Sequence, residues 1–260
     1  MPTPFDLMVA PNGARLQKTD HPAVPISNDE IVEAACRCER AGATSVHVHV
    51  REQKGLHSLD AARYGEVVRS LTERTKLRIQ ISTEAADIFD VAAQLRCLSE
   101  VPASDASVSL REISRAPELF EKLYATAVQR EIDVQHILYS PEEVTELFRR
   151  FENGSIPEQN RRAIFVLGRY AADQQSDVAD LSPFLKAKGN NNLNWSVCAF
   201  GRAEQECLMA ALEEGGHARI GFENNRTAPN GSLFESNEAS VAAFVERAAR
   251  AGFRPAREII

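Results

Sequence analysis

The amino-acid sequence predicts an α/β fold, a (β/α)8 TIM barrel that residues 1–260 form as a single domain. Eight short β-like segments alternate with eight longer helical segments, and the connections between them are short. No repeat, low-complexity tract or linker interrupts the chain, and 260 residues suit one such barrel. A doubly wound open sheet is the alternative, but the GxGxxG turn expected after its first strand is missing from the sequence.

Eight apolar segments, several of them rich in Val and Ile, have the length and composition of strands. The predicted strands are LMVA (7–10), SVHVHV (45–50), LRIQIS (77–82), ASVSL (106–110), DVQHIL (133–138), AIFVLG (163–168), LNWSVC (193–198) and ARIGF (218–222).

The segments between these strands contain helix start and stop signals. Residues 27–30, Ser-Asn-Asp-Glu, form a predicted capping box for a helix that ends near Ala41, where Gly42 suits the C-terminal cap. Residues 140–143, Ser-Pro-Glu-Glu, predict a second capping box with proline at the first helical position. The other predicted helices are residues 60–75, 86–98, 117–130, 176–187, 203–214 and 237–251.

The composition excludes several classes of function. The 30 basic and 37 acidic side chains give a net charge of −7 without a basic cluster, so we expect no nucleic-acid partner. No apolar run reaches the length of about 18 residues that a membrane span requires. The N-terminal segment lacks the layout of a signal peptide, and the five cysteines are odd in number without a CxxC spacing. These features predict a cytoplasmic protein with reduced structural thiols.

The stretch VHVHVRE (46–52) contains two histidines two positions apart in a predicted strand. Alternate side chains share a face, so His47 and His49 point into the predicted barrel while the valines pack under the helices. Residues i and i+2 lie about 6.6–6.8 Å apart along a strand, close enough for two imidazoles to bind one ion. Two interpretations stay open at this point: hydrogen-bonded core histidines, or half of a metal site.

The last predicted strand supplies a third candidate ligand. In HARIGFENN (217–225), alternation places Arg219, Gly221 and Glu223 on one face, with glycine leaving room inside the barrel. Glu223 then lies at the carboxyl end of this strand, the rim at which barrel enzymes carry their chemistry. Two histidines and one glutamate with an open position form a catalytic zinc set. The alternative for Glu223 is a rim carboxylate that pairs with Arg219.

Other polar residues follow the ends of predicted strands. Taken singly, each fits a helix cap, a turn or a solvated rim position, whereas their collection at one end of the sheet indicates a binding site. These residues are Asn12, Ser82, Thr83, Ser109, Gln135, Gly201 and Arg202.

The sequence resembles the β-keto acid cleavage enzymes, the family that includes 3-keto-5-aminohexanoate cleavage enzyme. The resemblance runs over nearly the whole chain, and the pairing of AGAxxxHxHxR with GGHxRxGxE is its most specific part. The segments that carry it are APNGA (10–14), HPAVPISNDEIVEAA (21–35), AGATSVHVHVRE (41–52), ISTEA (81–85), SDASVSLRE (104–112), WSVCAFGRAE (195–204), GGHARIGFENN (215–225) and NGSLFESNEASVAAF (230–244).

This resemblance implies a (β/α)8 barrel with a divalent metal, usually Zn²⁺, on His47, His49 and Glu223. It implies that a small β-keto acid and acetyl-CoA react to give acetoacetate and a new acyl-CoA thioester. The metal would act as a Lewis acid on the keto and carboxylate oxygens, and Arg219 would supply a fixed positive charge or orient the base. The family forms homo-oligomers, so a homodimer or homotetramer is the expectation.

The resemblance also implies roles for residues around the substrate. Ser82 and Ser109 stand where the family places hydroxyl or amide groups, and Arg202 would contact the CoA end.

Three positions depart from the family pattern. The aspartate that the family uses as base after the metal glutamate is Asn224 here, and an amide cannot accept the proton. A family glutamate on the fifth strand is Gln135, and the glycine after Ser82-Thr83 is Glu84. Three alternatives follow: Glu84 or a hydroxide on the metal is the base, the pocket serves another reaction of an aldolase or hydrolase type, or the barrel binds metal and ligand without catalysis.

Overall fold

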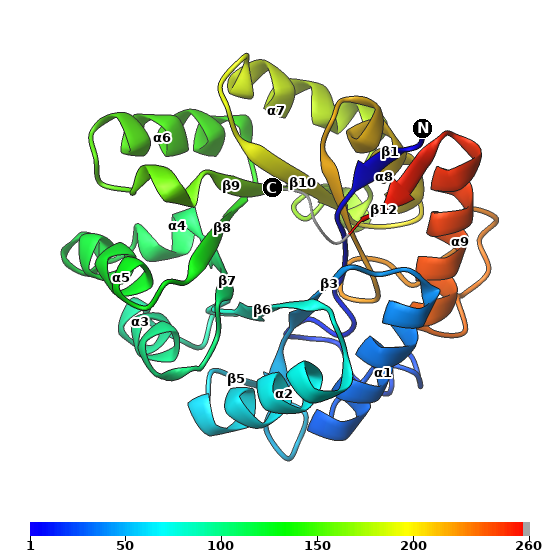
Figure 1. The fold of residues 1–260 in the computed structure, drawn as a ribbon, viewed down its shortest axis with the longest axis horizontal. Helices are drawn as coiled ribbons and strands as arrows, with labels where there is room; N and C mark the ends of the chain where they lie inside the picture. The colour runs from blue at the N-terminus through cyan, green and yellow to red at the C-terminus, as the bar shows by residue number, and fades with distance from the viewer. Residues whose placement is uncertain (257–260) are drawn as a thin grey trace.

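The computed structural model describes residues 1–256 and contains a closed barrel of eight parallel strands (Figure 1). The strands follow one another around the barrel in chain order, and the last pairs with the first to close it. The barrel strands are β2 (Leu7–Val9), β3 (Ser45–Val48), β6 (Arg78–Ser82), β7 (Asp105–Ser109), β8 (Asp133–Leu138), β9 (Arg162–Leu167), β10 (Asn194–Ala199) and β11 (His217–Ile220). Each overlaps a predicted strand, so the predicted single-domain barrel is confirmed. Residues 257–260 of the predicted domain lie outside the described residues.

The helices form an outer ring around the barrel (Figure 1). Among residues 1–256, no helix is long and apolar enough to cross a membrane. The helices are α1 (Asn28–Ala41), α2 (Ala61–Arg74), α3 (Val91–Glu100), α4 (Leu110–Ile113), α5 (Pro117–Gln129), α6 (Pro141–Glu152), α7 (Leu181–Lys188), α8 (Glu204–Glu213) and α9 (Asn237–Arg250), with the short 3₁₀ helices η1 (Glu158–Asn160), η2 (Ala172–Gln174) and η3 (Val178–Asp180).

Two small strand pairs lie outside the barrel. Parallel strands β1 (Thr3–Phe5) and β12 (Phe253–Pro255) join the two ends of the described chain. Antiparallel strands β4 (Val50–Arg51) and β5 (His57–Ser58) extend the chain beyond the carboxyl end of β3.

The first predicted capping box is present at the start of α1. The Ser27 hydroxyl accepts a hydrogen bond from the Glu30 amide at 3.2 Å, and the Glu30 carboxylate accepts one from the Ser27 amide at 3.1 Å. Gly42 ends the helix in the left-handed conformation, with a φ of 114°.

Two predictions about helix starts are wrong. Pro141 begins α6 as predicted, but the Ser140 side chain makes no capping hydrogen bond to this helix in the described structure, and the Glu143 carboxylate accepts from the Tyr139 amide at 2.6 Å. The predicted helix over 86–98 begins only after Asp90, whose side chain caps it, since Ala86 and Asp87 have positive φ values of 49° and 65°.

The strands separate two apolar layers. Val46, Val48 and Val50 are fully buried in the large core between the barrel and the helices, as predicted from strand alternation. A smaller apolar cluster fills part of the barrel interior and includes Ile137, Val166 and Phe200 among its members. The five cysteines are buried and free, with no disulfide in the part of the chain described.

A polar layer crosses the barrel interior beneath the histidines. Gln80 donates hydrogen bonds to Asp105 at 2.9 Å and to Gln135 at 3.1 Å, and Gln135 donates to Ser196 at 3.1 Å. Asp105 pairs with the buried Arg162 at 2.9 Å. The side chains of this layer satisfy one another's polar groups, as burial requires.

Candidate metal centre and active site

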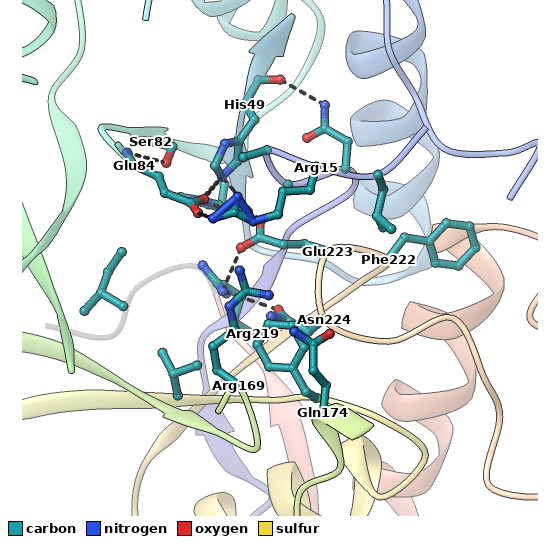
Figure 2. A pocket seen from close by; sticks show the side chains of 18 of the residues that line it. Arg15, His49, Ser82, Glu84, Arg169, Gln174, Arg219, Phe222, Glu223 and Asn224 are labelled. Atoms are coloured by element: carbon teal, nitrogen blue, oxygen red, sulfur yellow. Dashed lines mark hydrogen bonds and ion pairs between the residues drawn. The ribbon is translucent and has the colours of Figure 1, made fainter. Parts of the chain in front are cut away.

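A cavity of about 230 Å³ opens in the barrel and is lined by residues from strand ends and the loops that follow them (Figure 2). This is the carboxyl rim of the barrel, the position predicted for the site. The lining residues are Asn12, Gly13, Ala14, Arg15, Leu16, His47, His49, Ser82, Glu84, Ile137, Tyr139, Val166, Arg169, Gln174, Phe200, Arg219, Phe222, Glu223, Asn224 and Arg226.

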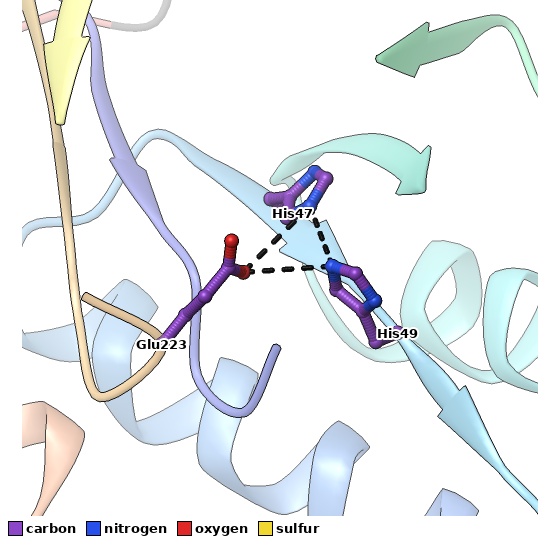
Figure 3. A group of neighbouring side chains, drawn as sticks. All are labelled: His47, His49 and Glu223. Atoms are coloured by element: carbon purple, nitrogen blue, oxygen red, sulfur yellow. Dashed lines mark hydrogen bonds and ion pairs between the residues drawn. The ribbon is translucent and has the colours of Figure 1, made fainter. Parts of the chain in front are cut away.

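The three predicted metal ligands meet in this cavity (Figure 3). The Nε2 atoms of His47 and His49 lie 3.0 Å apart, and the Oε2 atom of Glu223 lies 3.7 Å and 3.6 Å from them. Ligand atoms that bind one ion at about 2.0–2.2 Å are separated by similar distances. The geometry therefore fits one divalent ion held by two nitrogens and one oxygen.

The protonation of these groups also suits a metal. Burial lowers the pKa of His47 to about 4 and that of His49 well below its ordinary value, so both imidazoles are neutral at neutral pH. Burial opposes ionisation of Glu223, but neighbouring positive charges, Arg219 first among them, outweigh it and lower its pKa. The Oε2 atom of Glu223 is buried without a hydrogen-bond partner among the described residues. Neutral imidazoles and an ionised carboxylate are the forms that bind metal.

Neighbouring strands orient the histidines. His47 pairs in register with Gln80 of β6, and its Nδ1 atom lies 2.8 Å from the Gln80 side-chain oxygen. A proton on Nδ1 leaves the Nε2 lone pair of His47 facing the site. The backbone oxygen of His49 accepts a hydrogen bond from Asn12 at 2.9 Å, which fixes the start of the loop after β2 against this strand.

Glu223 reaches the site from a turn, not from a strand as predicted. Strand β11 ends at Ile220, and the Glu223 amide donates to the backbone oxygen of Ala10 at 3.1 Å. Gly221 has a φ of 136°, and a Cβ atom there would lie 2.4 Å from the same Ala10 oxygen. The prediction that Gly221 leaves room inside the barrel is therefore wrong, because the Ala10 backbone occupies that space.

Arg219 is buried beside the predicted ligands. Its Nη2 atom donates to Glu223 Oε1 at 3.0 Å, to Asn224 Oδ1 at 3.3 Å and to the Cys198 sulfur at 3.2 Å. Glu223 thus uses one oxygen for Arg219 and turns the other toward the histidines. The two interpretations that the sequence left open for Glu223, arginine partner and metal ligand, are compatible.

Glu84 is the second carboxylate that lines the cavity. Its Oε2 atom lies 3.9 Å from His49 Nε2, and its Oε1 atom lies 3.8 Å from Arg15. Burial, reinforced by the negative charge of Glu223, raises the pKa of Glu84 to about 7. A carboxyl group with this pKa exchanges protons readily near neutral pH.

The other predicted site residues divide into two groups. Asn12, Ser82 and Asn224 line the cavity, and the Asn224 amide nitrogen has no hydrogen-bond partner within residues 1–256. Thr83, Ser109, Gln135 and Arg202 lie elsewhere.

The residues of the second group lie below or outside the cavity. The Thr83 hydroxyl donates to the backbone oxygen of Ser107 at 2.8 Å and so links β6 to β7. Gln135 belongs to the polar layer beneath the cavity. Ser109 is buried at the end of β7, and Arg202 is exposed in the loop before α8. A role for Arg202 toward CoA stays a prediction.

Sequence reasoning missed several lining residues. Tyr139 and Arg169 stand directly after predicted strands, so the rule used for the other strand ends would have found them. Gln80, which does not line the cavity but lies beneath it and holds His47, was also missed, although alternation places it on the inward face of its predicted strand with Ser82. Arg15 and Arg226 lie farther along loops, where no periodicity marks them.

The chain is similar to known proteins over most of its length. The family model of the beta-keto acid cleavage enzyme matches residues 5–258. The 3-keto-5-aminohexanoate cleavage enzyme of Fusobacterium nucleatum is 26% identical over 260 residues, which cover 95% of this chain and 90% of that protein. The 3-oxoadipate:acetyl-CoA acetyltransferase of Cupriavidus necator is 26% identical over 255 residues, covering 93% and 87%.

Solved structures show the same fold. ObcA in its binary complex with oxaloacetate superimposes with a TM-score of 0.71 at 15% identity, covering 91% of this chain but 66% of the ObcA chain, slightly less than two thirds. A type I 3-dehydroquinate dehydratase from Clostridium difficile gives a TM-score of 0.62 at 10% identity, covering 96% and 94%.

Proposed function

This chain belongs to the beta-keto acid cleavage enzyme family, and from that membership we propose that it condenses a small β-keto acid with acetyl-CoA to give acetoacetate and an acyl-CoA. The observation that carries the proposal is the convergence of His47, His49 and Glu223 in a cavity that also holds unsatisfied hydrogen-bond donors. The name of the Cupriavidus necator relative, an acetyl-CoA acetyltransferase, supports acetyl-CoA as the second substrate.

Zn²⁺, or another divalent metal, is the cofactor we propose for the three ligands. Two imidazole nitrogens and one carboxylate oxygen are donors typical of catalytic zinc. When bound, the ion would polarise the keto and carboxylate oxygens of the β-keto acid.

Arg219 and Asn224 hold the substrate oxygens in this proposal. The Arg219 Nε and the Asn224 Nδ2 atoms are buried donors without partners in the described structure. The Arg219 Nη2 atom donates to Asn224 Oδ1 at 3.3 Å, which fixes both side chains before the substrate binds. Donors that are oriented in advance stabilise developing negative charge without reorganising.

Glu84 takes the proton in place of the family aspartate. An amide at position 224 cannot accept it, whereas the Glu84 carboxyl lines the same cavity and has a pKa of about 7. The C2–H bond of the β-keto acid breaks, the proton moves to Glu84, and the electron pair passes to the keto oxygen as an enolate. C2 then attacks the thioester carbonyl of acetyl-CoA, and CoA leaves as a thiolate.

The exchange is completed when the thiolate attacks the original keto carbon. The bond between C2 and that carbon breaks, Glu84 returns its proton to C2, and acetoacetate and the new acyl-CoA leave. Atoms and charge balance without any further reactant.

The test combines metal analysis with turnover. Elemental analysis of the purified protein should show about one equivalent of a divalent metal for the three-ligand site. Acetyl-CoA and a panel of β-keto acids should then give acetoacetate, and removal of the metal should stop its formation. A metal-loaded protein that makes no acetoacetate across the panel would contradict the proposal.

A second candidate is a metal-binding barrel with another activity, of the aldolase or hydrolase type, or with none. The amide at Asn224 favours this candidate, because it removes a carboxylate from the cavity. The amide at Gln135 does not favour it, because Gln135 lies in the polar layer beneath the cavity and not in the lining. The same panel without acetyl-CoA separates the two candidates, since only the second can turn over without the thioester.

We further propose a homodimer or homotetramer in the cytoplasm. Family membership supports the oligomer, and the five free buried thiols support the cytoplasmic location.

A further inference from the structure

Four arginines line the cavity, together with two glutamates, in a protein whose net charge is −7. The cavity is therefore richer in positive charge than the chain as a whole, even before a metal binds. A concentration of like charges in a pocket attracts a ligand of the opposite sign.

Three of these arginines already have a carboxylate partner. Arg219 pairs with Glu223 at 3.0 Å, and Arg15 pairs with Asp87 at 3.1 Å. Arg226 lies 4.0 Å from the Asp20 carboxylate and donates to its backbone oxygen at 3.0 Å.

Arg169 is different, because it has no ion pair and no hydrogen bond within residues 1–256. Its guanidinium carbon lies 5.2 Å from the centre of the Phe200 ring, and the side chain is partly buried. It is near enough to Glu84 and Glu223 to interact with both electrostatically. A partly desolvated guanidinium without a carboxylate partner is ready to bind an anion.

The backbone holds Arg169 at this place. It follows directly after Gly168, which has a φ of 76° and lies against the chain at Ser176, where a Cβ atom would be 2.7 Å from the Ser176 amide nitrogen. In Figure 2, Arg169 and Gln174 lie on the side of the cavity opposite His49. Part of the cavity lining is apolar and includes Ile137, Val166 and Phe200, which form one cluster.

We propose that Arg169 binds a second carboxylate of the substrate, so that the β-keto acids this protein prefers are dicarboxylates. This inference rests on the proposed function, in which the keto group and the first carboxylate lie at the metal ligands. The short methylene chain of the substrate then contacts the apolar part of the lining, and the second carboxylate reaches the guanidinium of Arg169. The metal site thus binds one end of the substrate, and Arg169 binds the other.

The diphosphate of CoA is the other source of negative charge. It lies at the far end of the pantetheine arm from the thioester, whereas Arg169 lines the same cavity as the metal ligands. The position of Arg169 therefore favours the substrate carboxylate.

The test compares 3-oxoadipate with 3-oxohexanoate, which has the same carbon chain but a terminal methyl group in place of the second carboxylate. We expect wild-type kcat/KM to favour the dicarboxylate by about 10- to 100-fold, the range for a hydrogen bond to a charged group. Arg169→Gln should abolish this preference, so that kcat/KM for the two acids agrees within about 3-fold; the ratio is the readout, because the lost charge near Glu84 and Glu223 affects the rates with both acids alike. Arg169→Lys should retain part of the preference.

Arg69→Gln is the matched control, since Arg69 is an exposed arginine of α2 outside the cavity lining. It should leave the preference unchanged. Equal wild-type rates with the two acids would overturn the inference, and so would a preference that survives Arg169→Gln. A raised KM for acetyl-CoA in Arg169→Gln with an unchanged preference would assign the arginine to CoA instead.

Binding by calorimetry separates this inference from the proposed function. If the metal-loaded protein turns over no β-keto acid of the panel, the proposed function fails, but the dicarboxylate should still bind at least about 10-fold more tightly than the monocarboxylate. The difference should disappear in Arg169→Gln, whose folding is checked by circular dichroism. Equal binding of the two acids to the wild type overturns the inference whatever the turnover.

Discussion

Glu84→Gln should make the protein inactive and more stable at the same time. The substitution keeps the size of the side chain and removes its ability to take a proton. Loss of a general base lowers turnover by about 10²- to 10⁴-fold. The metal ligands are untouched, so bound metal and the KM for the β-keto acid should change little.

The gain in stability follows from the pKa of Glu84. This pKa is about 7 in the folded metal-free protein, compared with an ordinary value of 4.5. Since one pKa unit corresponds to about 1.4 kcal/mol, full ionisation of Glu84 lowers the free energy of unfolding by about 3 kcal/mol. Partial exposure of the side chain, 19%, reduces our expectation to about 2 kcal/mol. Because the folded pKa is raised, this cost is absent below pH 4.5 and reaches its full value above pH 7.

Urea unfolding of the metal-free protein at pH 5 and pH 8 measures the effect. The free energy of unfolding of Glu84→Gln should exceed that of the wild type by about 2 kcal/mol at pH 8 and by clearly less at pH 5. Glu52→Gln is the control, because Glu52 is a nearby carboxylate outside the cavity lining that already pairs with Arg63 at 3.0 Å. Turnover within a few-fold of wild type would refute the role as base, and an equal difference at both pH values would refute the burial argument.

Three further substitutions test the site and its support. His49→Ala should remove bound metal and acetoacetate formation together; full metal content by elemental analysis would contradict the ligand set. Asn224→Asp should raise the rate of cleavage by about 10-fold if a carboxylate at this position can share the proton transfer, and an unchanged kcat would show that the position does not carry the proton. Gly221→Ala should lower the free energy of unfolding by about 2–4 kcal/mol in urea, because its Cβ meets the Ala10 oxygen, whereas Gly215→Ala, with open space around it, should cost about 1 kcal/mol; similar losses would disprove the steric argument.

Strand periodicity made the convergence of the candidate metal ligands predictable. A period of two determines which face each residue of a strand occupies, so His47 and His49 had to share the inward face once the strand was recognised. Glu223 was found although the last strand ends earlier than predicted, at Ile220, because the turn after β11 folds over Ala10 and keeps the side chain at the same rim.

Periodicity does not give the height of a residue inside the barrel. Gln135 and Ser82 both face inward, but Gln135 is the third residue of β8 and lies in the polar layer, whereas Ser82 ends β6 and lines the cavity. The loop arginines follow no period at all. The strand-end rule gives the place of Arg169 but not its direction, which depends on a positive φ at Gly168 and on the contact of Gly168 with Ser176, and a single sequence does not reveal these.

The polar layer under the cavity has a consequence for how this protein can change over time. Hydrogen bonds and ion pairs run from His47 through Gln80 and Asp105 to Arg162, and Arg162 also pairs with Asp133, whose side chain is 42% exposed at the start of β8. A charge change at Asp133 can therefore alter the basicity of a metal ligand from the opposite end of the barrel. If the loop residue Arg169 selects the substrate as proposed, metal affinity and specificity can be adjusted by separate substitutions.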